Sequence, residues 1–304
     1  MANEQIKYNG YQSEKTKESP KQQLEQMMAQ ISQETNRGLG QSIINQRGAI
    51  MMATFQQGLG GPYDAETAAH DTKHIANRKL EFSGAYNLPE GPERQKHVAL
   101  WEKARSESNP ELLEMAVTGL LYKELNEDFL VARGAVYDDF ENGADNVIVN
   151  KHTGDVVCAF DEVHDTDDGE YSQMKNEKIL ATAMNGGANI KYGLTFDQDK
   201  KLVKTALQNI PVFYLSLQGA ELDELLADLS TDSHKTSPTE HRFYEKLVNS
   251  LEEQRDTLLS QPGLPEPVKA NLIKFQYSLN MMKKAKPKLV KRQPPKLVKK
   301  PQLT

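Results

Sequence analysis

Acidic residues stand beside two short apolar runs in the middle of the chain, where they could hold a metal ion. Asp145 directly precedes the run 146–150, and Asp161 and Glu162 directly follow the run 156–160. A carboxylate buried beside apolar strands is costly unless it is paired or bound to a cation. Carboxylate oxygens are also the ligands that Mg²⁺ takes in proteins. The pattern therefore predicts a metal site at the ends of two strands.

The two runs form a predicted hairpin that must position these acids. Thr153-Gly154 supplies the turn between them. Side chains alternate between the faces of a strand, so only one of Asp161 and Glu162 can share a face with Asp145. We favour Asp161, because it stands in register with the small Ala159, which leaves room for a metal.

The elements expected around the hairpin alternate between helices and strands. A helix over 110–126 carries Glu114 at the margin of its apolar face, with Pro110 at the first helical position. After a strand over 129–136 and the hairpin, we expect a helix over 171–184 that contains Lys175 and Lys178. Strands over 190–196 and 210–217 and a helix over 221–229 follow.

This succession resembles the PD-(D/E)XK nuclease superfamily over residues 110–230. The resemblance matches Asp145 to the family's strand aspartate and Asp161 or Glu162 to its second acid. Glu114 matches the helix glutamate, with Glu124 as the alternative. It implies a mixed α/β fold with a restriction-endonuclease-like core, a central mixed sheet flanked by helices. It also implies phosphodiester hydrolysis of DNA or RNA with Mg²⁺ or Mn²⁺, held by Asp145, Asp161 and Glu162.

The lysine of the family's acid-x-lysine motif is missing. Val163 stands two residues after Asp161, and His164 stands two residues after Glu162. Some members of the superfamily carry this cation on the following helix, which makes Lys175 or Lys178 the candidate. Lys191, on the next strand, is a third choice. Without a lysine near the metal, the fold would remain and catalysis would be lost.

A structural interpretation of the same residues also stays open. Asp145 could cap a strand, and Asp161 with Glu162 could form a solvated strand end.

A second metal hypothesis concerns the helix expected over 64–78. It places Glu66, His70 and His74 at intervals of four residues, as in some zinc helices, although a solvated helix face fits this spacing better.

Composition limits the class of protein. The single cysteine, Cys158, excludes a disulfide framework, and no long apolar run or leader-like segment is present. We therefore expect a soluble, cytoplasmic protein that does not enter a membrane.

The net charge of −6 is unevenly distributed along the chain, because residues 283–304 contain nine basic residues and no acidic ones. This tail, in which PKLVK occurs twice, could bind nucleic acid through Lys283 to Lys300 or an acidic protein partner.

Five segments are expected in all. They are a disordered polar segment over 1–38, a helical extension over 39–109, the α/β core over 110–230, a helical hairpin over 231–282 and a disordered basic tail over 283–304. The polar amino terminus, the helix pair and the repeated tail also suit an alternative function. In that alternative the protein is a non-enzymatic scaffold or assembly component.

Overall fold

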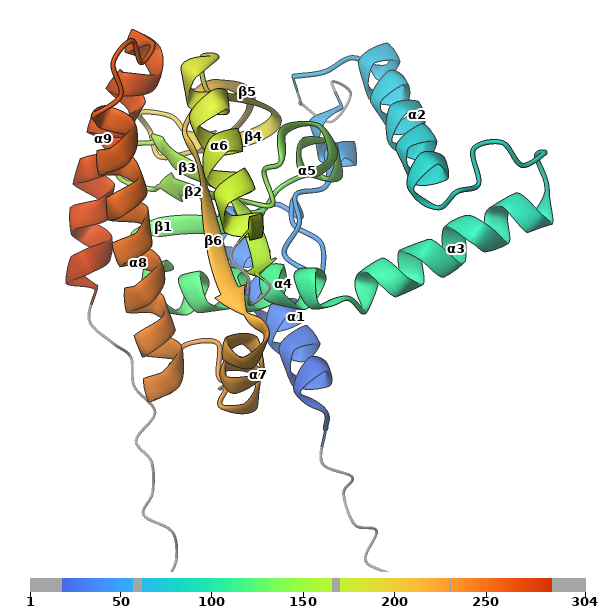
Figure 1. The fold of residues 1–304 in the computed structure, drawn as a ribbon, viewed down its shortest axis with the longest axis horizontal. Coiled ribbons are helices and arrows are strands. Elements are labelled where there is room, and N and C mark those ends of the chain that lie inside the picture. The colour runs from blue at the N-terminus through green and yellow to red at the C-terminus, as the bar shows by residue number, and fades with distance from the viewer. Residues whose placement is uncertain (1–17, 57–61, 166–169, 230, 286–304) are drawn as a thin grey trace, which may run out of the picture.

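The computed structural model describes residues 18–56, 62–165, 170–229 and 231–285, apart from the side chains of residues 157, 158, 161–165, 170–173 and 175. The basic tail predicted to bind nucleic acid lies almost wholly outside these residues. The described part is a mixed α/β fold, as the sequence predicts (Figure 1). Its elements are α1 (Pro20–Leu39), η1 (Met52–Phe55), α2 (Ala65–Phe82), α3 (Pro92–Ser106), α4 (Asn109–Leu125), β1 (Phe129–Arg133), α5 (Val136–Asn142), β2 (Asn146–Asn150), β3 (Val156–Asp165), α6 (Glu170–Met184), β4 (Ala188–Phe196), β5 (Leu202–Ile210), β6 (Val212–Gln218), α7 (Gly219–Ala227), α8 (Pro238–Leu259) and α9 (Glu266–Lys284).

A four-stranded mixed sheet forms the centre, with the strand order β1-β2-β3-β6. The first three strands pair antiparallel, and β6 pairs parallel to β3. A parallel pair needs a long crossover between its strands, which here contains α6 and the β4–β5 hairpin. The C-terminal end of β1, the N-terminal end of β2 and the C-terminal ends of β3 and β6 therefore meet at one end of the sheet.

Each face of this sheet carries its own apolar core. On one face Val131, Ile148 and Phe160 pack with residues of α1, α4, α7, α8 and α9. On the other face Val149 and Ala159 pack with the β4–β5 hairpin and the segment 43–55. A strand that is buried on both faces is apolar without alternation, which explains the continuous apolar runs of β1 and β2.

The C-terminal helix pair is confirmed. Ser237 caps α8 in a capping box with Glu240, and α8 packs on α9 through an apolar face that joins the core of the sheet. The Tyr244 hydroxyl donates to the Met282 carbonyl at 2.8 Å, which fixes the end of α9 on α8. The pair is therefore part of the same packed body as the sheet.

The predicted disorder of residues 1–38 is wrong from residue 20 onward. α1 begins after the capping residue Ser19 and buries Leu24, Met27, Met28 and Ile31, largely against α4. Two of these methionine side chains fit beside Gly119 of α4, which has no Cβ to exclude them. A segment with so little apolar surface folds through this tertiary contact and not through its own propensity.

Three other segments differ from the sequence prediction. The expected helical extension over 39–109 is not helical over 41–51, where isolated bridges form and Ile43 and Ile50 are buried, and only a short 3-10 helix follows. The strand expected over 129–136 ends at Arg133, and α5 begins at Val136. A polar stretch after residue 200 forms β5, whose partly exposed residues hold their place by pairing with β4.

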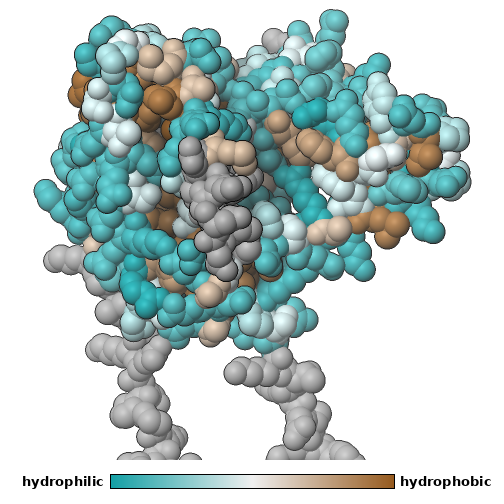
Figure 2. Space-filling model, viewed as in Figure 1, coloured by the Kyte–Doolittle hydropathy of each residue, from teal (hydrophilic) through white to brown (hydrophobic). Residues whose placement is uncertain are grey.

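Helices α2 and α3 extend from one side of the body as an arm (Figure 1). α3 has no buried residue, and the arm leaves Phe82, Tyr86 and Leu100 at least half exposed. Figure 2 shows hydrophobic side chains scattered over this arm among hydrophilic ones. The arm meets the body at two places: α2 contacts α5 and η1, and α3 leads into α4 next to the sheet end described above.

Candidate functional site

Two predicted acids stand next to each other where β2 begins. Asn146 and Phe160 are paired across β2 and β3, and one residue further along the two chain segments stand Asp145 and Asp161. The Asp145 amide nitrogen donates to the Phe160 carbonyl oxygen at 2.8 Å. Asp145, partly exposed, is thereby held beside the middle of β3, which continues to Asp165 and does not end at Phe160 as predicted. Glu162 follows at the next position of β3, where the alternation of the strand assigns it to the opposite face.

Glu114 lies at the same end of the sheet, but its carboxylate has a cationic partner. Arg133, the last residue of β1, donates Nη2 to Glu114 Oε2 and binds Glu111 through Nη1–Oε1 at 2.8 Å and Nη2–Oε2 at 3.1 Å. One turn further along α4, Thr118 Oγ1 donates to Asn146 Oδ1 at 2.6 Å. α4 is therefore tied both to β1 and to the start of β2.

The two glutamates around Arg133 have different acidities. Burial, together with the negative charges of Glu111 and Asp139, raises the pKa of Glu114 to about 7 against the effect of Arg133. Burial also acts on Glu111, but the hydrogen bond and charge of Arg133 outweigh it and hold the pKa of Glu111 below its ordinary value. Glu114 is thus the carboxyl of this pair that takes up a proton near neutral pH, and a carboxyl must lose its proton to bind a metal.

The alternative helix glutamate, Glu124, is remote from this site. It lies ten residues further along α4, about 15 Å at the helical rise. Its Oε1 accepts from His241 Nδ1 at 3.1 Å, on α8. Glu124 therefore belongs to the packing of α4 on α8.

The candidate lysines differ in what surrounds them. Lys178 is exposed on α6, and the side chain of Lys175 lies outside the described part of the structure. Lys191 Nζ pairs with Asp71 Oδ2 at 2.6 Å and lies 4.9 Å from the centre of the Tyr137 ring. Lys191 is therefore committed to α2 and α5.

The histidines of α2 do not form a metal site with Glu66. His70 Nδ1 lies 3.3 Å from Asp71 Oδ1, and His74 Nε2 lies 2.9 Å from Glu141 Oε1 of α5. Among the described residues, no group of three or more potential ligands is arranged around a common point. The side chains of Asp161 and Glu162 are not among the described residues. The finding therefore applies to the histidines of α2 and does not test a metal site at Asp145 and Asp161.

A buried network behind the arm was not predicted from the sequence. Asp71, fully buried on α2, accepts from the Tyr192 hydroxyl at 2.6 Å as well as from Lys191. Asp138 of α5 accepts from the backbone amides of Lys191 and Tyr192 at 2.7 and 2.8 Å. Burial raises the pKa of Asp138 to about 6, although these amides favour its ionised form. The network fixes α2 and α5 on β4.

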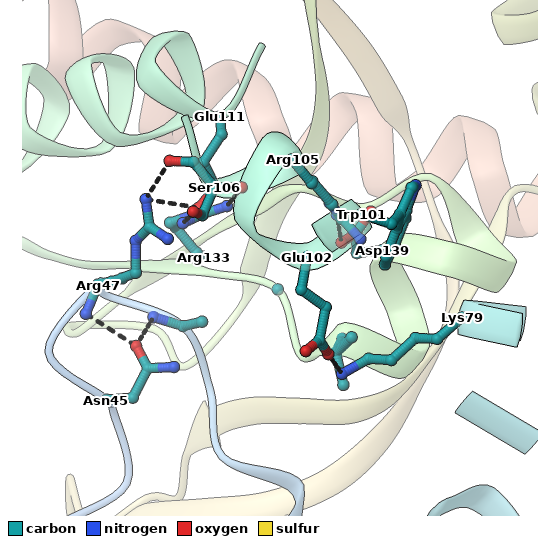
Figure 3. A pocket seen from close by; sticks show the side chains of 13 residues that line it. Asn45, Arg47, Lys79, Trp101, Glu102, Arg105, Ser106, Glu111, Arg133 and Asp139 are labelled. Carbon is teal, nitrogen blue, oxygen red and sulfur yellow. Dashed lines mark hydrogen bonds and ion pairs between the residues drawn. The ribbon is translucent and has the colours of Figure 1, made fainter. Parts of the chain in front are cut away.

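Three arginines around a cavity were missed as well. The cavity has a volume of about 320 Å³ and lies between the segment 45–49, the α3–α4 junction and the start of α5 (Figure 3). Arg47, Arg105 and Arg133 line it together with Trp101. An arginine that ends an apolar strand, as Arg133 does in FLVAR, was the available signal in the sequence.

Comparison with known proteins gave no relative. No protein family, curated protein or solved structure matches this chain. None of the described helices combines the length and apolar character that a membrane-spanning segment needs.

Proposed function

We propose that the protein is a Mg²⁺- or Mn²⁺-dependent nuclease with a PD-(D/E)XK-like core over residues 110–230. The succession α4–β1–β2–β3–α6–β6 around a mixed sheet supports a restriction-endonuclease-like core, with α5 inserted between β1 and β2 and the β4–β5 hairpin before the last strand. The observation that carries the proposal is the meeting of Asp145 and Asp161 where β2 begins.

The positions of these two aspartates fit a divalent cation. Neighbouring residues across an antiparallel pair have Cβ atoms about 5 to 8 Å apart, so two carboxylates there can share an ion with metal–oxygen distances of about 2.1 Å. Asp145 and Asp161 would hold the metal, while Glu162, assigned to the opposite face of β3, would take no direct part. A bound Mg²⁺ would neutralise the phosphate and lower the pKa of water.

Basic residues of the chain would carry out the roles that the metal does not. Lys175 or Lys178, on the helix that follows β3, would orient the attacking water and stabilise the charge that develops on the phosphate. Arg133 holds Glu114 and α4 against the strand that precedes Asp145, which keeps the sheet end in place. Lysines of the tail would add salt-sensitive attraction to the nucleic acid.

The direct test is cleavage of single- and double-stranded DNA and RNA in the presence of Mg²⁺ or Mn²⁺. We expect cleavage by the wild type and loss of it in Asp145→Asn and in Asp161→Asn. Asp199→Asn is the matched control, because Asp199 lies in the β4–β5 turn with its side chain 78% exposed. Undiminished cleavage by Asp145→Asn would reject the site.

The absent acid-x-lysine motif gives the second candidate function, a scaffold or assembly protein built on a core of this type. Val163 at the motif position and the exposed α3 favour it. A folded wild type that cleaves no substrate with either metal would support the scaffold and reject the nuclease.

A further inference from the structure

Two of the arginines that line the cavity beside the sheet end are partly exposed. The Arg47 side chain is 33% exposed, and its Nη2 donates to the Ser106 carbonyl at 3.1 Å and lies 3.4 Å from Glu111 Oε1. The Arg105 side chain is 30% exposed. The Arg133 side chain is only 9% exposed, and Glu111 and Glu114 occupy its guanidinium. A guanidinium has five N–H donors, so Arg47 and Arg105 can donate to an oxyanion in the cavity in addition to their present partners.

An aromatic surface stands on the other side of the same cavity. Figure 3 shows Trp101, Arg105 and Asp139 grouped opposite Arg47 and Glu111. The Trp101 ring stacks on Phe82 at 6.0 Å between centroids and 8° between planes. Phe82 itself is 50% exposed. Such a ring pair at a cavity wall can stack a nucleic-acid base whatever its sequence.

The positive side chains that line the cavity are paired with carboxylates that line it too. Arg105 Nη2 bonds Asp139 Oδ2 at 2.5 Å, and Lys79 Nζ bonds Glu102 Oε1 at 2.6 Å. These carboxylates fix the cations in place and leave little excess positive charge. Affinity for an anion would therefore come from positioned guanidinium donors and from stacking, and not from a broad basic field.

The cavity also adjoins the proposed cleavage site. Gly134, which lines it, donates its amide to the Asp145 carbonyl oxygen at 2.7 Å. A nucleotide bound in the cavity would thus lie next to the residue proposed to hold the metal. Arg133, which lines the cavity, pairs in the sheet with Asn146, the residue that follows Asp145.

We propose that this cavity binds one nucleotide of a single-stranded nucleic acid, with its phosphate at Arg47 and Arg105 and its base against Trp101. The choice of nucleic acid as ligand rests on the proposed function. The cavity would make the substrate an unpaired strand, because a base inside a duplex is not free to stack on Trp101. The arm of α2 and α3 acquires a role in this arrangement, since α3 supplies Trp101 and Arg105.

The single tryptophan of the chain provides the test. The fluorescence of Trp101 is titrated with a single-stranded oligonucleotide, the matching duplex and inorganic phosphate, all in EDTA, so that binding is measured without cleavage. We expect the single strand to change the Trp101 emission at lower concentrations than the duplex or phosphate does. Arg47→Gln and Arg105→Gln, at partly exposed positions, should weaken binding about tenfold or more, as for a lost charge-assisted hydrogen bond.

Arg242→Gln is the matched control, because Arg242 is 59% exposed on α8 and bonds Glu224 at 2.7 Å. It should bind as the wild type does, and circular dichroism establishes that each variant is folded. Unchanged Trp101 emission on addition of the single strand would overturn the proposal. So would equal affinity for phosphate or duplex, or wild-type affinity in folded Arg47→Gln. Because EDTA removes the metal, this titration measures binding whether or not the protein cleaves. The cleavage assay tests the proposed function separately.

Discussion

The glutamate pair around Arg133 gives a prediction of stability against pH. Glu114 has a folded-state pKa of about 7, above its ordinary value of 4.5, because it is buried and flanked by other carboxylates. A carboxyl whose pKa is raised on folding stabilises the folded state when it is protonated. That contribution is complete below pH 4.5 and is lost as the pH rises through 7. Replacing Glu114 with glutamine keeps the shape and removes the titration.

The size of the effect follows from the two pKa values. Between pH 5 and pH 8 the wild type should lose about 2.5 kcal/mol of unfolding free energy relative to Glu114→Gln, at 1.36 kcal/mol per pKa unit. Urea unfolding of both proteins at several pH values, followed by circular dichroism, measures this difference. Glu111 titrates in both proteins and so largely cancels in the comparison.

Two results would refute this reasoning. A constant difference between wild type and Glu114→Gln from pH 5 to pH 8 would show that Glu114 does not titrate in this range. A difference of the opposite sign, with the wild type gaining stability as the pH rises, would show that Arg133 keeps Glu114 ionised. The second result would return Glu114 to the candidate metal ligands.

Two further predictions concern the framework of the site. Lys123 and Glu240 form a fully buried ion pair between α4 and α8, with Lys123 Nζ 2.5 Å from Glu240 Oε1, so Lys123→Met should cost about 3 to 5 kcal/mol in urea unfolding. The double variant Lys123→Met with Glu240→Gln, which keeps an acceptor for the Ser237 amide, should recover most of that loss, and a double variant as unstable as the single one would contradict the prediction. A Cβ on Gly134 would stand 2.0 Å from the Ala144 carbonyl oxygen, a backbone atom, so Gly134→Ala should lose about 1 to 3 kcal/mol and shift Asp145. Wild-type thermal stability in Gly134→Ala would show that the backbone there can yield.

Much of the sheet was predictable because its signals are local. β2 has the predicted bounds, since an apolar run lies between Gly143 and the Thr153-Gly154 turn. The pairing that sets Asp145 beside Asp161 does not follow from the turn alone, because the register shifts between Ile148 and Val149.

The parts that were missed depend on contacts between distant segments. α1 is polar along most of its length, and only its packing on α4 gives it a buried face. The contact between Glu114 and Arg133 joins a helix to the strand that follows it. The spacing of residues along the sequence does not show that these two side chains meet. For the same reason Glu114 was expected to assist a metal, whereas the structure places it in an ion pair.

The central claim is that Asp145 and Asp161 act together on one metal ion. Calorimetric titration with Mn²⁺ of the wild type, Asp145→Asn, Asp161→Asn and the double variant tests it directly, with Asp199→Asn as the control. We predict that the wild type and the control bind Mn²⁺ and that each single variant loses this binding as fully as the double variant does. Mn²⁺ binding that survives in Asp145→Asn, or losses that simply add in the double variant, would contradict a shared site.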